Sequence, residues 1–341
     1  MMKKILTLFL FLTVSVSVFA QTSDYSDDKY DELIKQGDYE AVISSVTETK
    51  ESDFSASDCF YLGLSYFSLE DDARAQKYLK LAVKKAPDYI KAYDYLAGSY
   101  FFSGKNDDAL TYYQKCILLD SEYFHAYKMI GQIYEQKGDL EKAYENYVQY
   151  YQLHQSADSS YFLGKILYEF GEYEDAKAYI EFCVKENKDN FNYNLLMVGI
   201  YYALEDYDNA MTYKTKLHQI WEKSEDEEIK SIKSFFLFAL TYGEYEIEVF
   251  EKLDRTESVY NFFSCYVKSN GKVVKRVNLE YNKSKQPYPY TITIDDIKSN
   301  MHMTSTVSMD IIPELNVCIM YLQQAVDNEL TIAYKTRGIK K

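Results

Sequence analysis

The sequence predicts an α solenoid of helical hairpins followed by a small antiparallel β-domain, either a sandwich or a barrel. Three observations lead to this fold class: short polar turns that recur about every 34 residues, a change to alternating apolar and polar residues after residue 242, and a change in charge at the same point. Residues 21–241 carry 23 basic and 40 acidic side chains, whereas residues 242–341 carry 13 of each. The net charge of −15 therefore belongs to the predicted solenoid.

The first twenty residues are typical of a secretory signal peptide. Lys3 and Lys4 precede an apolar run from Ile5 to Ala20, and Val18 and Ala20 are small residues at the positions that a signal peptidase inspects. The alternative is an uncleaved anchor, but the run is shorter than the ~20 residues that cross a bilayer. We therefore expect an exported chain that begins at Gln21, is periplasmic or secreted or associated with the outer membrane, and has no transmembrane segment once mature.

Composition excludes several classes of protein. With 47% hydrophobic and 17% aromatic residues, including 37 tyrosines, the chain can bury enough apolar surface to fold. An excess of carboxylates disfavours binding to nucleic acid, because phosphate contacts need clustered Lys and Arg. The five cysteines are widely spaced and form no CxxC pair, so we expect buried core thiols rather than a metal site, with a single disulfide as the alternative.

A repeat of 34 residues organises the region before residue 224. Six polar turns each end in an alanine, and these alanines are separated by 34, 34, 34, 33 and 34 residues: Ala41, Ala75, Ala109, Ala143, Ala176 and Ala210. A second series of small residues precedes the turns at Gly63, Ala97, Gly131, Gly164 and Gly199. Small residues at these positions allow the two helices of a hairpin to approach closely, and large residues such as Leu79, Tyr113 and Tyr147 then fill the space between them.

This pattern resembles the tetratricopeptide repeat over residues 24–223, with five full repeats and a degenerate first one. Two features depart from the family pattern. The usual Trp position holds Cys59, Tyr93, Tyr127, Ser160 and Leu195, and only one repeat is closed by a proline, Pro87. Asp28 and Lys29 replace the small pair of the first unit, which predicts a short polar first helix at the end of the solenoid. An apolar stripe at Ile229, Ile232, Phe235, Phe236 and Leu240 predicts a terminal capping helix over residues 224–240, so that the solenoid domain spans 21–241.

Residues 242–341 are predicted to be an all-β domain. Asn270 and Gly271 lie between two strand-like segments, 259–268 and 272–281, and this dipeptide is the strongest short signal for a hairpin. Further strands are expected where apolar residues alternate or cluster, at 245–249, 290–294, 307–311, 317–322 and 330–334.

No catalytic or cofactor motif is present in the sequence. The four histidines lack a zinc-protease spacing, and no nucleophile elbow, phosphate loop or dinucleotide fingerprint occurs. We therefore expect a protein that is not an enzyme, without catalytic residues, cofactor or metal.

The resemblance implies that the first helix of each hairpin faces a concave groove that binds protein or peptide. The positions that it places in this groove are Phe60, Leu64, Phe67, Asp94, Phe101, Phe102, His125, Lys128, Gln132, Glu135, Tyr161, Lys165, Tyr168, Tyr193, Leu196 and Ile200. Leu64 and Ile200 are equally well explained as core residues. The family's carboxylate clamp is disfavoured, because Gln132 stands where its Asn should be.

Two functions from different classes remain open at this point. The first is a non-catalytic exported scaffold or adaptor that binds another envelope component, with a basic or neutral partner fitting the acidic solenoid best. The second places a carbohydrate- or ligand-binding module, or an unrecognised hydrolase, in the β-domain with the repeats as a spacer. Tyr288 and Tyr290 are the candidate glycan-stacking residues in that case.

Overall fold

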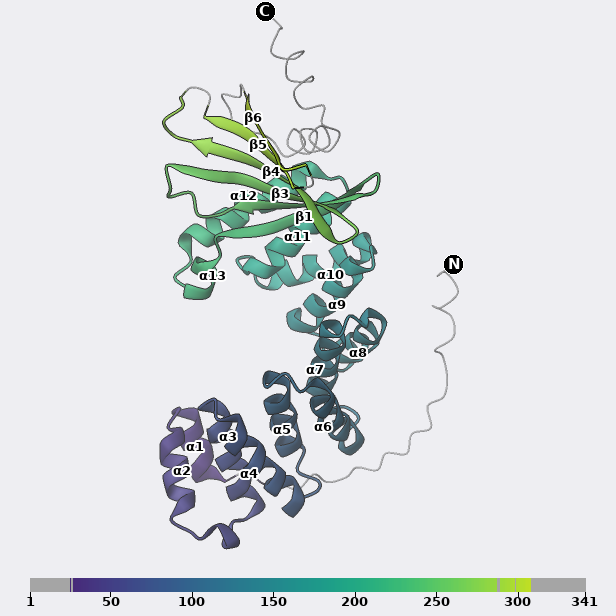
Figure 1. Ribbon diagram of the computed structural model, residues 1–341. Coiled ribbons are helices and arrows are strands. Elements are labelled where there is room, and N and C mark those ends of the chain that lie inside the picture. The colour runs from purple at the N-terminus through teal and green to yellow at the C-terminus, as the bar shows by residue number, and fades with distance from the viewer. Residues whose placement is uncertain (1–24, 26, 287–288, 298, 308–341) are drawn as a thin grey trace, which may run out of the picture. The chain divides into compact units, whose positions relative to one another are not determined.

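The computed structural model describes residue 25 and residues 27–286, 289–297 and 299–307 (Figure 1). Within this part of the chain, helices extend to Ser231 and are followed by antiparallel strands from Ser234 onward. The predicted α solenoid with a C-terminal antiparallel β-domain is therefore confirmed. The chain divides into two compact units, one that ends at His154 and one that begins at Gln155.

The first unit consists of four helical hairpins. They are formed by α1 (Asp28–Lys35) with α2 (Tyr39–Thr47), α3 (Ala56–Ser68) with α4 (Asp72–Lys85), α5 (Ile90–Phe102) with α6 (Asn106–Leu119), and α7 (Phe124–Gln136) with α8 (Leu140–Leu153), and a 3-10 turn spans Glu51–Asp53. Helix α1 has 8 residues and α3 has 13, so the first helix is short, as the sequence predicts.

Close approach of the two helices in a hairpin depends on the small residues of the first one. A Cβ atom added at Gly63 of α3 would lie 2.5 Å from Leu79 Cγ on α4, and one at Gly131 of α7 would lie 2.5 Å from the Tyr147 ring on α8. Real Cβ atoms do not come so close, so larger residues would force the helices apart. This confirms the packing role that the spacing predicts.

The turns between paired helices need a left-handed residue followed by an N-cap. Gly104 and Gly138 have φ of 73° and 76°, and Asp71 and Asp139 cap the next helix by accepting from the backbone N–H groups of Arg74 and Lys142. In two turns a glutamate replaces the glycine and still adopts positive φ, 58° at Glu70 and 59° at Glu205. Such a conformation costs a non-glycine residue roughly 1 kcal/mol.

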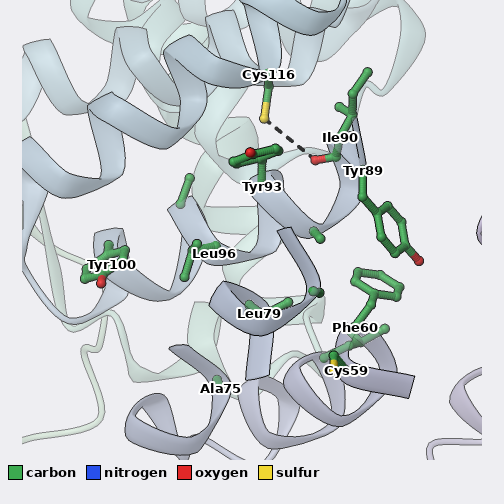
Figure 2. Close-up of a cluster of buried hydrophobic side chains, with 14 of the residues drawn as sticks. Cys59, Phe60, Ala75, Leu79, Tyr89, Ile90, Tyr93, Leu96, Tyr100 and Cys116 are labelled. Atoms are coloured by element: carbon green, nitrogen blue, oxygen red, sulfur yellow. Dashed lines mark hydrogen bonds between the residues drawn. The ribbon is translucent and has the colours of Figure 1, made fainter. Parts of the chain in front are cut away.

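The core of the first unit is a continuous cluster of aromatic, aliphatic and thiol side chains between the helices (Figure 2). Cys116 is fully buried and its Sγ lies 3.8 Å from the carbonyl oxygen of Ile90. Cys59, Cys183 and Cys265 are likewise buried, as the spacing predicts, whereas Cys318 lies outside the described residues. Burial raises the pKa of the Cys59 thiol to about 11, so this group stays protonated and unreactive.

The second unit combines two further hairpins with a sheet. Its helices are α9 (Ala157–Glu169), α10 (Tyr173–Glu186), α11 (Phe191–Ala203), α12 (Tyr207–Lys223) and the short α13 (Glu227–Ser231). The strands are β1 (Ser234–Tyr242), β2 (Tyr245–Lys252), β3 (Val259–Ser269), β4 (Lys272–Asn282), β5 (Tyr290–Asp296) and β6 (Met301–Val307).

The six strands form one antiparallel sheet in the order β1-β2-β3-β4-β5-β6. The predicted hairpin at Asn270-Gly271 joins β3 to β4, with φ of 51° and 72° at the two residues. Inward side chains such as Ile247, Val249 and Val267 are fully buried. The predicted strands at 317–322 and 330–334, and the end of the one at 307–311, lie outside the described residues.

The predicted capping helix over residues 224–240 is wrong in its second half. Helix α13 ends at Ser231, and residues 234–242 form β1 instead. Phe235, Leu237 and Phe238 are all buried, a pattern that a β-bulge between Phe236 and Phe238 permits. A run of adjacent aromatic and aliphatic residues fits helical and strand periods alike, and pairing with β2 across the Gly243 turn decides between them. The strands thus begin eight residues earlier than the expected boundary.

The inner face of the sheet packs on α11 and α12. Tyr202 of α11 contacts Phe238 of β1 at 4.9 Å between ring centroids, and His218 of α12 contacts Phe235 at 6.1 Å. In this unit the last helical hairpin therefore supplies the layer that covers the sheet, and the two form one compact body with α9 and α10.

Candidate functional site

The first helices of the hairpins in the first unit carry a row of aromatic rings. The ring of Phe60 on α3 lies beside that of Tyr89 (Figure 2), with 4.8 Å between the ring centroids. The centroid of the Tyr95 ring on α5 lies 5.7 Å from that of Phe60. Phe67 of α3 then lies 5.9 Å from Tyr95 and 5.8 Å from Phe102 of α5. We call this set the aromatic row: Tyr25, Tyr89, Phe60, Tyr95, Phe67, Phe102 and Phe101.

Exposure changes along the aromatic row. Phe60 and Tyr89 are 4% exposed and serve as part of the core, whereas Phe67 and Phe101 are half-buried. Phe102 is 69% exposed, which is unusual for a phenylalanine at the end of a well-packed helix. Its ring contacts Phe67 and Phe101 on one side and solvent on the other. This end of the row is an apolar surface available to a partner.

A cavity of about 510 Å³ lies at the other end of the row. It is lined by helices α1, α3 and α5 and by residues that precede α1, α5 and α7. The lining residues are Tyr25, Asp31, Ile34, Phe60, Tyr61, Leu64, Asp88, Tyr89, Ile90, Lys91, Tyr95, Asp120 and Tyr123. Its lining combines aromatic rings with three carboxylates and one lysine. Such a surface favours a ligand with apolar groups and hydrogen-bond donors, or with positive charge.

Three tyrosine hydroxyls of this cavity, those of Tyr61, Tyr95 and Tyr123, keep their protons because their pKa values are raised. Burial and a hydrogen bond to the Asp31 carboxylate raise the pKa of Tyr61 far above its usual range. Burial and the charge of Asp94 also raise the pKa values of Tyr95 and Tyr123. Because these hydroxyls keep their protons, the cavity offers fixed donors beside acidic acceptors.

The structure brings four of the predicted groove residues into the aromatic row and places the others outside this row. Phe60, Phe67, Phe101 and Phe102 meet in the aromatic row. Asp94 on α5 instead pairs with His125 on α7, 2.8 Å from its Nδ1 atom. Leu64 is 8% exposed, so it belongs to the core, and it also forms part of the lining of the cavity.

The remaining predicted positions of α7 have structural partners. The ammonium group of Lys128 lies over the Tyr150 ring at 6.0 Å, and Tyr147 donates to Glu135 at 2.8 Å. Gln132 is half-buried on the same helix.

In the second unit the predicted residues are divided between surface and core. Tyr161 of α9 and Tyr193 of α11 contact each other at 5.3 Å, and Tyr168 packs against Gly199. Ile200 is fully buried and belongs to the core, whereas Lys165 and Leu196 are half-buried.

Sequence reasoning missed Tyr25, Tyr89 and Tyr95 as members of the row. Tyr89 precedes α5 and Tyr95 lies one position beyond the groove slot carried over from the family, so neither was selected. The signal that could have found them is the high density of tyrosine and phenylalanine between residues 89 and 102.

Neither a metal-binding cluster nor a membrane-spanning helix is seen in the described part of the chain. There, no group of three or more His, Cys, Asp or Glu residues is arranged to hold a metal ion. None of the helices described is both long and apolar enough to cross a bilayer.

Comparison with known proteins agrees with the repeat geometry. Family models described as tetratricopeptide repeat match residues 60–89, 96–160 and 157–190. No curated protein sequence matches the chain.

Solved structures of similar fold include a Pseudomonas aeruginosa protein described as pilF, with 18% identity, a TM-score of 0.52, and coverage of 60% of this chain and 95% of that one. The C-terminal part of a TPR repeat-containing protein from Cytophaga hutchinsonii has 18% identity, a TM-score of 0.50, and coverage of 57% and 78%. A MamA protein has 21% identity, a TM-score of 0.45, and coverage of 49% and 92%. The six helical hairpins of the described residues, the 34-residue period and the family models that match between residues 60 and 190 identify this part of the chain as tetratricopeptide repeats, which a β-sheet follows.

Proposed function

We propose that this protein is a non-catalytic, exported scaffold of the cell envelope whose first unit binds an extended peptide segment of another protein along the aromatic row. The observation that carries this proposal is the combination of the largely exposed Phe102 ring with the acidic, tyrosine-lined cavity on the same helices. Aromatic side chains supply much of the energy at protein interfaces, and polar groups around them set orientation.

The partner segment should be basic or neutral. Asp31, Asp88 and Asp120 all line the cavity, against a single lysine, Lys91. Residues 21–241 also carry 17 more acidic than basic side chains, from 40 against 23. A positively charged segment would be attracted to this surface at a distance, whereas an acidic one would be repelled.

A peptide-display experiment tests the binding site. The chain from Gln21 is screened against random nine-residue peptides, and the dissociation constant of the best one is measured for wild type, Phe102→Ala and Phe182→Ala. Phe182 on α10 is 43% exposed and serves as a matched control. We expect Phe102→Ala to weaken binding about tenfold or more, as for an interface hot spot, and Phe182→Ala to have no effect. Equal binding by wild type and Phe102→Ala would refute the assignment.

Export rests on the sequence of residues 1–20 and is tested separately. We expect N-terminal sequencing of the mature protein from a bacterial envelope fraction to begin at Gln21. Recovery of the intact leader on a cytoplasmic protein would contradict the exported part of the proposal and leave the peptide-binding part unaffected.

A second candidate function concerns the sheet. A cavity of about 550 Å³ next to β2 and β3 is lined by Phe250, Tyr266, Asn261, Ser264 and Lys252, among others, a mixture of aromatic and polar groups that suits a small polar ligand. The glycan-stacking role expected for Tyr290 is not available, because this side chain is 4% exposed, and Tyr288 lies outside the described residues. Loss of binding on a glycan array in the variant Tyr266→Ala, against wild type, would favour this candidate.

A further inference from the structure

The segment before α1 inserts a tyrosine into the cavity. The Tyr25 ring stacks on Tyr89 with 4.4 Å between centroids and an interplanar angle of 28°. Its hydroxyl donates to Asp88 Oδ1 at 2.6 Å, and its backbone carbonyl oxygen accepts from the Ser57 hydroxyl at 3.0 Å. The side chain and the backbone carbonyl of Tyr25 are thus both held by residues that are distant from it in the sequence.

The groups that hold Tyr25 are positioned by the hairpins rather than by Tyr25 itself. Tyr89 packs against Phe60 and precedes α5, where its N–H donates to the carbonyl of Ala86 in the turn around Pro87. Ser57 lies in the first turn of α3, between Ser55 and Asp58, the two residues of its capping box. A stacking surface, an acceptor for a hydroxyl and a donor for a carbonyl are therefore presented together on rigid elements, as in a peptide-binding subsite.

We propose that Ser57, Asp88 and Tyr89 form a tyrosine-binding subsite for an extended peptide, and that the chain's own Tyr25 is its tethered occupant. The inference rests on the proposed function, since it names one side chain of the peptide that this helix face would bind. Tyrosine fits better than phenylalanine, because only tyrosine has the O–H group that donates to Asp88. A phosphotyrosine is excluded, because its charge would face the Asp88 carboxylate.

Tethering gives Tyr25 an advantage over a free peptide. A short tether provides an effective concentration of the order of millimolar. A partner peptide therefore has to displace Tyr25 in order to use this subsite, and removal of the Tyr25 side chain should expose the subsite to peptides in trans.

The test uses the chain beginning at Gln21 and a fluorescent neutral peptide, QTSNYSN, which is the sequence of residues 21–27 with both aspartates replaced by asparagine. We expect the variant Tyr25→Ala to bind this peptide at least about tenfold more tightly than wild type, because its subsite is vacant. Binding by Tyr25→Ala should fall when the peptide tyrosine is replaced by phenylalanine, and should be lost when it is phosphorylated. The double variant Tyr25→Ala with Asp88→Asn should also bind more weakly than Tyr25→Ala.

Two results would overturn the inference. One is equal binding of the peptide by wild type and Tyr25→Ala. The other is a wild-type dimer that becomes a monomer in Tyr25→Ala, which would mean that the occupant comes from a second copy. Tyr25→Phe retains the stacking ring, so it serves as a second variant if Tyr25→Ala is poorly folded. If displayed peptides still bind through Phe102 when QTSNYSN does not, the proposed function stands and the subsite alone is refuted.

Discussion

Helices α5 and α11 occupy equivalent places in their repeats but have different surroundings. Phe101 of α5 and Tyr202 of α11 stand at corresponding positions, eight residues before the turn alanines Ala109 and Ala210. Tyr202 is 5% exposed and lies against Phe238 of the sheet, whereas Phe101 is half-buried and its neighbour Phe102 is 69% exposed. The same repeat surface is thus covered from within the chain in the second unit and remains accessible in the first, which is why we place the partner on the first.

The covered interface of the second unit also contains buried charge. Glu251 of β2 is 1% exposed and is contacted by Lys214 at 3.2 Å, by His218 at 2.8 Å and by Arg255 at 2.6 Å. Lys214 and His218 belong to α12, so these ion pairs join the last helical hairpin to the sheet. We propose that the aromatic row of the first unit binds a partner, whereas this charged cluster holds α12 to the sheet.

The largest expected effect is on this cluster. Glu251→Ala should destabilise the second unit by about 3–5 kcal/mol, because it leaves buried cations without their counter-ion. Urea unfolding followed by the fluorescence of Trp221, the only tryptophan, reports on this unit directly. Glu248→Ala removes the half-exposed pair with Lys268 and is the control, with an expected loss below about 1 kcal/mol. Equal effects of the two substitutions would contradict the assigned role of the cluster.

Truncation of aromatic rings should distinguish the covered from the accessible surface. Phe238→Ala removes a ring that is 6% exposed and should cost about 3 kcal/mol or more of unfolding free energy. Phe102→Ala removes a ring that is mostly in solvent and should change stability by no more than about 0.5 kcal/mol. Thermal unfolding monitored by circular dichroism measures both. A large loss in Phe102→Ala would mean that this residue is part of the core and not a binding surface.

The charged cluster also predicts a dependence of stability on pH. Burial acts to raise the pKa of Glu251, but the hydrogen bond from His218 and the charges of Lys214, His218 and Arg255 outweigh it, so the pKa lies below its ordinary value. The stabilisation is therefore present above the pKa of an unfolded glutamate, about 4.3, and is lost as the pH falls below that value. We expect the stability difference between wild type and Glu251→Gln to shrink between about pH 5 and pH 3. A difference that stays constant over this range would contradict the ionised state of Glu251.

The smallest expected effect concerns the turns and should be the same in both units. Glu70→Gly and Glu205→Gly relieve positive φ at a non-glycine residue, which should raise the unfolding free energy by up to about 1 kcal/mol. Gly104→Ala should act in the opposite direction at the equivalent turn. If Glu70→Gly lowered the stability instead, the glutamate side chain would have a role that its backbone conformation does not indicate.

Repetition in the sequence explains how much of the fold could be predicted. The alanine period and the small residues at Gly63 and Gly131 predict the hairpins because each hairpin depends on local contacts. Strand β1 was predicted as helix, since its adjacent apolar residues satisfy both periods and its partner β2 decides the outcome.

The site was harder to predict than the fold. Phe60, Phe67, Phe101 and Phe102 were predicted from their repeat positions, and the structure brings these rings together. Contacts such as Tyr25 with Asp88 and Lys214 with Glu251 join residues that have no repeat relation to each other. Non-local pairings of this kind follow from the packing of whole elements, which a single sequence does not display.

Photo-crosslinking of a selected peptide tests most directly the claim that the partner binds the accessible helix face of the first unit. A displayed peptide that carries a benzophenone side chain is irradiated with the chain from Gln21, and the modified residues are identified by mass spectrometry. We predict that the crosslinks fall within α3 and α5, in residues 56–68 and 89–102, and that they disappear in Phe102→Ala. Crosslinks on α11, α12 or the strands from Ser234 onward would contradict the account.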